Sequence, residues 1–489
     1  MSLSAHLAER VAATTLYVDG DWRAASGEPL DVFDPTNEEV LASPASASAD
    51  DVEAALASAR RAQPGWASTP ASIRGGHLRA MADVIADHAD DLVGLIVQEV
   101  GKPRHEAEGE VAFAEGFLRY NAEWDRRLEG EILPGDSPGE VIHLLRAPIG
   151  VVAAICPWNF PLAVLCRKLG PALVTGNTVV IKPSEVSPLG TIELVALWDE
   201  HLDLPPGVVN LVTGAAPTGE AMVRSPLTGL VSFTGHANTG KRVMAVASEN
   251  LTRVSLELGG KAPAIVWKDA DLDIAVPAII SARHTNAGQV CTSAERVLVH
   301  QDVLESFTDR YVAAAQALRV GLPGEGADMG PLVSSAQLEK ATAAVAKAIE
   351  EGASVVTGGG RPDGDGFAAG YWQAPTVLRD VRPDMSVMRD ETFAPVTPIL
   401  GIDSLEEALS VANDSRYGLS AYLFSRDYPT VMRTVDELQF GEIYINRTLG
   451  ESIHAHHAGF KESGIGGEDG KWGLLRYTQI KTAYHRYGG

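Results

Sequence analysis

Residues 149–258 alternate short apolar runs with helical patterns, and this alternation constrains the fold more than any other feature of the sequence. The runs are rich in β-branched residues and fall at about 150–155, 178–182, 207–212 and 229–233. A strand followed by a helix, repeated in this way, predicts parallel βαβ units and a doubly wound sheet. Ligands bind such sheets beyond the carboxyl ends of the strands. We therefore expect a binding site in the turns that follow these runs.

Two of these turns combine prolines with polar side chains. In CPWNFP (156–161), Asn159 lies in a turn fixed by two prolines, so its amide fits either an oxyanion hole or ordinary turn chemistry. In KPSE (182–185), Lys182 and Glu185 fit the ribose hydroxyls of a dinucleotide, and the carboxylate would repel the extra phosphate of NADP. A surface ion pair is the alternative for this second turn.

Two glycine-rich segments differ in their context. FTGHANTG (233–240) follows an expected strand and opens a helix, so Gly235 and Gly240 would let the backbone approach a pyrophosphate. The pattern is not GxGxxG, and a plain turn explains it equally well. GGGRPDGDG (358–366) has no strand–turn–helix context and predicts a surface turn.

The rest of the chain adds helices, a hairpin and a second α/β unit. An N-terminal strand, TLYVDGDWR, precedes helical patterns over 50–66 and 70–126, with a break near 101–103. Residues 128–148 predict a hairpin around PGDSPG, and the C-terminal segment ends in a β-prone run. From Asp271 onward we expect helices near 271–284, 302–317 and 335–351.

Length and composition exclude several classes of protein. A chain of 489 residues is too long for one core, so we expect two or three domains. A net charge of −24 argues against a nucleic-acid partner, and no run approaches the ~20 apolar residues of a membrane span. The three cysteines lack CxxC spacing and no signal-peptide pattern is present, which predicts free thiols in the cytoplasm.

One of these cysteines, Cys291, lies in the polar stretch NAGQVCTSAER (286–296). Upstream, LELGGKAP (256–263) carries Glu257 before a Gly–Gly turn. A thiolate is a strong nucleophile and a nearby carboxylate can act as general base. A small buried apolar residue is the alternative interpretation of Cys291.

Taken together and in this order, the motifs resemble the aldehyde dehydrogenase superfamily along nearly the whole chain. The matching segments are CPWNFPL, GNTVVIKPSE, FTG, LELGGKAPAIV, NAGQVCTSAERV, ETFAPV (391–396) and GFKESGIGGEDG (459–470). The resemblance implies an α/β fold with a doubly wound, parallel-sheet NAD-binding domain, an α/β catalytic domain and a small β oligomerisation segment. The NAD-binding domain is expected to comprise residues 1–127 and 149–256, and the chain returns to it over 448–473. The catalytic domain is expected over 257–447, and the oligomerisation segment over 128–148 and 474–489.

The resemblance also assigns catalytic roles. Cys291 would be the nucleophile and Glu257 the general base, while Asn159 and the Cys291 backbone N–H would form the oxyanion hole. Lys168 and Glu468 match a proton-relay and structural network. The implied reaction is the oxidation of an aldehyde to a carboxylic acid through a thiohemiacetal and a thioester, with hydrolysis rather than transfer to coenzyme A because Glu257 is retained.

The cofactor implied is NAD. The positions matching its contacts in the family are Ile155, Pro157, Trp158, Lys182, Ser184, Glu185, Gly214, Gly219, Phe233, Thr234, Gly235, His236, Leu258, Gly259, Lys340, Glu391 and Phe393. One departs from the family pattern, because His236 replaces the usual serine at the pyrophosphate.

Three segments, AEWDRRLEGEI (122–132), CTSAERV from Cys291 onward and HAGFKESGIGG near the end, resemble the members of the family that oxidise lactaldehyde and glycolaldehyde. This resemblance implies a small hydroxyaldehyde as substrate. Arg167, Thr292, Glu451 and His457 match positions of that substrate pocket. A buried polar group disfavours a substrate that cannot pair with it. No metal site is expected, because the extra histidines His454 and His456 have no accompanying ligand pattern.

Two alternatives remain open. A semialdehyde dehydrogenase, for succinate or 2-oxoglutarate semialdehyde, would use Arg167 to bind the substrate carboxylate. An NAD-independent cysteine hydrolase or acyltransferase would need a histidine partner, for which His284 is the candidate near Cys291. The hairpin and the C-terminal strand resemble the family's oligomerisation segment, so we expect a homodimer or homotetramer.

Overall fold

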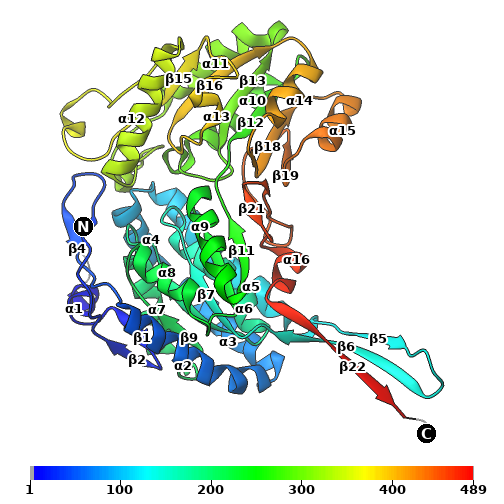
Figure 1. Cartoon of the computed structure of the whole chain (residues 1–489). Coiled ribbons are helices and arrows are strands. Elements are labelled where there is room, and N and C mark those ends of the chain that lie inside the picture. Colours follow the sequence, from blue (N-terminus) through cyan, green and yellow to red (C-terminus); the bar gives the residue numbers. More distant parts are fainter. Residues whose placement is uncertain (1–4, 488–489) are drawn as a thin grey trace.

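The computed structural model describes residues 5–487 and contains two large sheets, each with helices on both faces (Figure 1). A third, antiparallel sheet projects from the body as a narrow arm (Figure 1). This arrangement confirms the α/β fold with a doubly wound sheet, a second α/β unit and a small β segment. No helix among the described residues is long and apolar enough to span a membrane.

The first sheet has eight strands, and its centre is parallel. The order is β2 (Asp21–Arg23), β1 (Leu16–Val18), β9 (Val209–Leu211), β8 (Thr178–Lys182), β7 (Val151–Ile155), β10 (Leu230–Thr234), β11 (Arg253–Glu257) and β21 (Gly464–Ile465). The strands from β9 to β11 pair in parallel, whereas β1, β2 and β21 are antiparallel edges. The four runs predicted as strands are β7 to β10. β9 is shorter than its run because Gly207, at φ 81°, is still in the preceding turn.

Alternate residues of the central strands face opposite helical layers. Val151 and Ala153 pack against α2 (Ala49–Ser68), α8 (Ala216–Arg224) and α9 (Ala237–Ala247). Val152 and Ala154 belong to the core of the opposite layer. That layer comprises α3 (Ala71–Asp87), α4 (Ala89–Val100), α5 (Arg104–Ala122), α6 (Pro161–Val174) and α7 (Leu189–His201). The break predicted near residue 101 is the end of α4, where Gly101 has φ 77°.

The second sheet has seven strands. Its order is β14 (Ser354–Thr357), β15 (Thr376–Arg379), β16 (Val396–Ile402), β13 (Ala294–His300), β12 (Ala262–Val266), β18 (Ser420–Phe424) and β19 (Glu442–Ile445), with only β14 antiparallel. Val266 and Val297 pack against α10 (Leu272–His284) and α11 (Leu304–Ala317). Ile265 and Leu298 pack with α12 (Ser335–Glu350), α13 (Ser386–Arg389) and α14 (Leu405–Asn413).

The arm is formed by β5 (Glu131–Pro134), β6 (Glu140–Pro148) and β22 (Thr478–Arg486). The remaining elements are short or lie at the edges of the molecule. They are α1 (Ala5–Ala13), β3 (Val32–Phe33), β4 (Val40–Ala42), η1 (Glu123–Arg126), η2 (Ser248–Asn250), η3 (Thr285–Gly288), η4 (Gln301–Val303), η5 (Pro323–Glu325), η6 (Asp365–Phe367), β17 (Tyr417–Gly418), α15 (Tyr428–Glu437), β20 (Phe460–Lys461) and α16 (Gly470–Leu475).

The chain passes from the first sheet to the second between β11 and β12, and it returns to the first sheet at β21. The turn that follows β7 meets the loop that precedes β13, where Asn159 Nδ2 donates to the backbone oxygen of Gln289 at 2.9 Å. Side chains from both sheets meet in this region. The domain boundaries given above stay a prediction.

Candidate active site

Cys291 follows a tight, left-handed turn between α10 and β13. Asn286, Ala287 and Gly288 have φ values of 50°, 54° and 77°. A Cβ atom at Gly288 would lie 2.6 Å from the backbone carbon of Ala394, so no larger residue fits there. The backbone N–H of Asn286 donates to Glu106 Oε2 at 2.8 Å. The loop before Cys291 is therefore fixed by both its conformation and its contacts.

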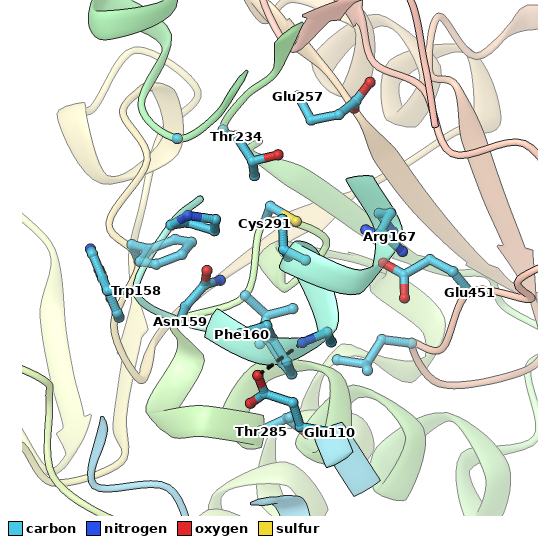
Figure 2. Close-up of a pocket in the computed structure, with 18 of the residues that line it drawn as sticks. Glu110, Trp158, Asn159, Phe160, Arg167, Thr234, Glu257, Thr285, Cys291 and Glu451 are labelled. Atoms are coloured by element: carbon cyan, nitrogen blue, oxygen red, sulfur yellow. Dashed lines mark hydrogen bonds between the residues drawn. The ribbon is translucent and has the colours of Figure 1, made fainter. Parts of the chain in front are cut away.

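Asn159 is tied to the same loop. Its side-chain Nδ2 donates to the backbone oxygen of Gln289 at 2.9 Å, and its own backbone oxygen accepts from Asn286 Nδ2 at 3.2 Å. A side-chain amide has two N–H donors, so one remains for a developing oxyanion. Figure 2 shows the Asn159 amide beside Cys291.

Glu257 ends β11 and lies across the pocket from Asn159 (Figure 2). It is 3% exposed, and neither of its carboxyl oxygens has a hydrogen-bond partner. Burial, opposed by the charge of nearby His457, raises the pKa of the Glu257 carboxyl to about 8. A carboxyl group with such a pKa is suited to proton transfer near neutral pH.

Lys168 and Glu468 form a buried ion pair next to Glu257. Lys168 Nζ lies 2.6 Å from Glu468 Oε1 and also donates to Thr234 Oγ1 at 2.7 Å. Burial alone would raise the pKa of Glu468, but the Lys168 ammonium outweighs it and the pKa is lowered. Neither side chain lines the cavity at Cys291, whereas Thr234 does. The ion pair therefore lies outside the cavity and holds the lining residue Thr234 in place.

A cavity of about 730 Å³ contains Cys291, Asn159 and Glu257. On the side of α5 and α6 it is lined by Phe113, Phe117, Phe160, Arg167 and Glu451. Arg167 Nη2 lies 3.0 Å from Asp469 Oδ2, and its guanidinium lies 4.9 Å from the centre of the Phe117 ring. Figure 2 shows Arg167 and Glu451 side by side near Cys291.

His457 lines the same cavity as Cys291. Its Nδ1 lies 2.9 Å from Glu442 Oε1, and its Nε2 lies 3.8 Å from Glu257 Oε2. His284, the candidate partner considered from the sequence, instead pairs its Nδ1 with the backbone oxygen of Ile280 at 2.9 Å.

A second cavity of about 350 Å³ adjoins the first at Trp158, Thr234, Gly235 and His236. It is lined, among others, by Ile155, Lys182, Ser184, Glu185, Gly219 and Phe233. Lys182 Nζ lies 3.6 Å from Glu185 Oε2, and it donates to the backbone oxygen of Gly214 at 2.5 Å. Gly214 itself does not line this cavity.

The two cavities fit an elongated dinucleotide. The N-terminus of α9 opens between them, and Gly235 keeps the approach clear, since a Cβ there would lie 2.6 Å from Phe233 Cζ. His236 is the N-cap of α9, and its Nδ1 accepts from the backbone N–H of Asn238 at 3.2 Å. Burial and the charge of Lys340 lower the pKa of His236, so the neutral ring keeps Nε2–H as a donor toward a phosphate.

Six of the cofactor positions expected from the sequence line the first cavity. They are Pro157, Leu258, Gly259, Lys340, Glu391 and Phe393. Trp158 and Phe393 meet edge to face with ring centres 5.4 Å apart. A Cβ at Gly259 would clash with the Glu391 carboxylate, whose Oε1 accepts from the backbone N–H of Gly260 at 2.9 Å.

Thr292 is the predicted substrate contact that the structure places elsewhere. Its side chain is fully buried and does not line the cavity. Its backbone oxygen accepts from Tyr422 Oη at 2.6 Å, so the residue turns toward the second sheet. Sequence reasoning missed the wall residues Phe113 and Phe117, whose only signal is their i, i+4 spacing on α5.

Sequence reasoning also missed Glu442, which is the partner of His457 and has no motif around it. Glu442, Glu451 and His457 have ligand atoms within 4.8 Å of one another, the one such group found among residues 5–487. It does not include His454 or His456.

The profile of the Aldehyde dehydrogenase family matches residues 22–483. The chain belongs to this family. It is 45% identical to the lactaldehyde dehydrogenase of Escherichia coli (strain K12) over 96% of this chain and 98% of that protein. The crystal structure of lactaldehyde dehydrogenase from Escherichia coli superposes with a TM-score of 0.94 and covers 97% of this chain and 99% of that one.

Two other aldehyde dehydrogenases differ in the cofactor that they are named with. The D-glyceraldehyde dehydrogenase (NADP(+)) of Thermoplasma acidophilum is 38% identical over 97% of both chains. The betaine aldehyde dehydrogenase of Staphylococcus aureus, solved in complex with NAD+, has a TM-score of 0.96 at 34% identity, covering 99% of this chain and 96% of that one. The present chain is thus an aldehyde dehydrogenase that oxidises an aldehyde to an acid, in a family whose structures hold a nicotinamide cofactor.

Proposed function

We propose that this aldehyde dehydrogenase oxidises a small 2-hydroxyaldehyde, such as lactaldehyde or glycolaldehyde, with NAD+ as cofactor. The observation that carries this proposal is the position of Arg167 beside two carboxyl groups (Figure 2). Asp469 lies 3.0 Å from Arg167, and Glu451 lines the same side of the cavity. Much of the positive charge of Arg167 is therefore already offset within the protein.

A hydroxyl group suits this environment better than a carboxylate does. A hydroxyl can donate to Glu451 and accept from Arg167, whereas a carboxylate only accepts and would be repelled by Glu451. The semialdehydes carry such a carboxylate and are disfavoured for this reason. Two relatives named for lactaldehyde and D-glyceraldehyde, both 2-hydroxyaldehydes, support the same substrate class.

The catalytic steps follow from the residues around the cavity. Cys291 attacks the aldehyde carbon, and the resulting alkoxide is held by the Asn159 amide and the Cys291 backbone N–H. A nicotinamide cofactor held beside Cys291 by the residues of the two cavities would supply the hydride acceptor for this oxidation. Glu257 then takes a proton from water, which attacks the thioester at Cys291 and releases the acid.

We assign NAD+ rather than NADP+ from the second cavity. Glu185 lies there beside Lys182, and its side chain is 42% exposed. A carboxylate in this position accepts ribose hydroxyls and repels an added phosphate.

We also propose a homo-oligomer assembled through the arm. Ile480 and Tyr484 of β22 are 59% and 79% exposed. Alternate residues of a strand share a face, so these two side chains lie on the same face of β22. Exposed apolar residues on a projecting sheet are typical of a protein interface. All three cysteines are free, which supports a reducing compartment, the cytoplasm.

The substrate proposal is tested by measuring kcat/KM with lactaldehyde, glycolaldehyde, succinate semialdehyde, 2-oxoglutarate semialdehyde and propanal. The hydroxyaldehydes should lead by at least about tenfold. Glu451→Gln should reduce the difference in kcat/KM between lactaldehyde and succinate semialdehyde. Glu437→Gln, on the exposed face of α15, should leave that difference unchanged. A semialdehyde preferred by the unmodified protein would refute the proposed substrate.

A further inference from the structure

Glu295 is a buried residue of β13, the strand that begins shortly after Cys291. Its Oε2 accepts from the backbone N–H of Thr392 at 2.8 Å, and its Oε1 accepts from the backbone N–H of Phe393 at 2.6 Å. Both oxygens of one carboxylate thus hold consecutive N–H groups of residues 391–393, called here the 391–393 segment. The strand that follows Cys291 therefore fixes the backbone of a segment far away in the sequence.

Lys261 binds the same carboxylate and the same segment. Its Nζ lies 2.6 Å from Glu295 Oε2 and donates to Thr392 Oγ1 at 3.1 Å. Burial would raise the pKa of Glu295, but the charges of Lys261 and Arg283 outweigh burial and the pKa is lowered. The carboxylate is therefore ionised, and both of its oxygens act only as acceptors.

Phe393 has a backbone conformation that needs such support. Its φ is 56°, in the left-handed region that a bulky residue rarely adopts. A residue in this region keeps its conformation only where the surrounding structure holds it. Glu295 holds the N–H of Phe393, and Gln337 Nε2 donates to its backbone oxygen at 2.6 Å. Loss of the Glu295 contact should therefore let this part of the backbone relax.

The 391–393 segment contributes two side chains to the cavity that contains Cys291. Glu391 and Phe393 line this cavity, whereas Glu295 lines neither cavity. The Phe393 ring meets Trp158 edge to face, and Trp158 borders both cavities. A cofactor that extends from one cavity to the other would pass this pair of rings. The direction of the Phe393 side chain depends on the backbone that Glu295 holds.

We propose that Glu295 is a positioning residue for the nicotinamide cofactor. By holding the 391–393 segment, it orients the Glu391 and Phe393 side chains toward a cofactor bound beside Cys291. Cys291 leads into β13, so the nucleophile and these cofactor contacts share one strand as support. The inference rests on the proposed place of the cofactor in the two cavities and does not depend on the aldehyde.

Glu295→Asp tests this inference through cofactor affinity. The shorter side chain keeps a negative charge near Lys261 but cannot reach both N–H groups. Fluorescence titration should show the Kd values of NADH and NADPH raised by the same factor, at least about tenfold. The factor should be the same because the added phosphate of NADPH is expected in the other cavity, at Glu185.

Glu99→Asp is the matched control. Glu99 is also fully buried, and its carboxylate accepts from the consecutive backbone N–H groups of Leu189 and Gly190 at 2.7 and 2.8 Å. Neither Leu189 nor Gly190 lines a cavity. This variant should lose a comparable contact and leave both Kd values unchanged. A similar loss of affinity in Glu99→Asp would overturn the inference, because it would reflect general destabilisation.

Hydrogen exchange in the cofactor-free protein gives a second readout. In Glu295→Asp, peptides that cover residues 391–396 should exchange faster, whereas the rate at which iodoacetamide alkylates Cys291 should not change. Unchanged Kd values for both cofactors would overturn the inference. Faster exchange without weaker binding would then show that Glu295 supports the segment but not the cofactor.

A double variant serves if Glu295→Asp fails to fold. Glu295→Gln combined with Lys261→Met removes both buried charges at nearly constant volume. The glutamine amide offers one acceptor oxygen in place of two, so both Kd values should again rise. A protein that binds NADPH more tightly than NADH would refute the assignment of NAD+. Equal weakening of both cofactors in that protein would still uphold the role of Glu295.

Discussion

The ammonium group of Lys102 donates a hydrogen bond to the backbone oxygen of Asn159 at 2.9 Å. Lys102 is fully buried and also pairs with Glu110 Oε2 at 2.5 Å. Glu110 Oε1 in turn accepts from the backbone N–H of Leu162 at 3.0 Å, at the start of α6. A buried ion pair from outside the recognisable motifs thus fixes the turn that carries the oxyanion-hole candidate.

Replacing Lys102 with methionine should impair both stability and catalysis. The Glu110 charge would stay buried without its partner, which typically costs about 3–5 kcal/mol in the free energy of unfolding. A misplaced Asn159 amide would lower kcat by up to about a hundredfold. Denaturant unfolding and steady-state kinetics measure these effects, with Lys471→Met on the exposed side of α16 as control. Unchanged kcat in a folded Lys102→Met variant would show that Asn159 is positioned without Lys102.

The rate of thioester hydrolysis should rise with pH through a midpoint near 8. The pKa of Glu257 is raised to about 8, so the carboxyl is mostly protonated below that pH and becomes the active base above it. Rapid-quench measurement of acyl-enzyme decay from pH 6 to 9.5 gives the profile. In Glu257→Gln the decay should be much slower and lose this rising limb. A profile of the unmodified protein that is flat over this range would contradict the role of Glu257.

Glu185 should control the choice between the two cofactors. In the unmodified protein, NADH should bind at least about tenfold more tightly than NADPH, and Glu185→Gln should remove most of that difference. Fluorescence titration of the purified protein with each reduced cofactor measures both dissociation constants. Equal affinities in the unmodified protein would contradict the assignment of NAD+.

The arm should be needed for assembly. Ile480→Asp places a charge on the exposed apolar face of β22 and should convert the oligomer to a monomer. Lys481→Asp is the matched control, because the adjacent residue points to the opposite face of the strand. Sedimentation velocity distinguishes the species. An oligomer that survives Ile480→Asp would argue against this face as the interface.

Contiguous motifs account for what could be predicted from the sequence. The alternation over 149–258 predicts β7 to β10. The helix expected near 271–284 is also present, as α10. Contacts between distant segments have no such signal. Lys102 meets Asn159, and Cys291 and His457 line one cavity, only because both sheets direct their loops into one space.

Thr292 illustrates the opposite case. It follows Cys291 in the sequence, and its motif places it among the substrate contacts, yet its side chain is fully buried away from the cavity. In the turn that leads into β13, adjacent residues face different sides. Position in a motif therefore does not determine whether a side chain faces the cavity.

The most direct test of the catalytic account is to trap the thioester on Cys291. Glu257→Gln is mixed with lactaldehyde and NAD+, and the digested protein is analysed by mass spectrometry while NADH is followed by absorbance. We expect a burst of about one NADH per active site and a lactoyl adduct on the Cys291 peptide. Cys291→Ala in the same background should show neither. No burst and no adduct, or an adduct on another residue, would contradict Cys291 as the nucleophile.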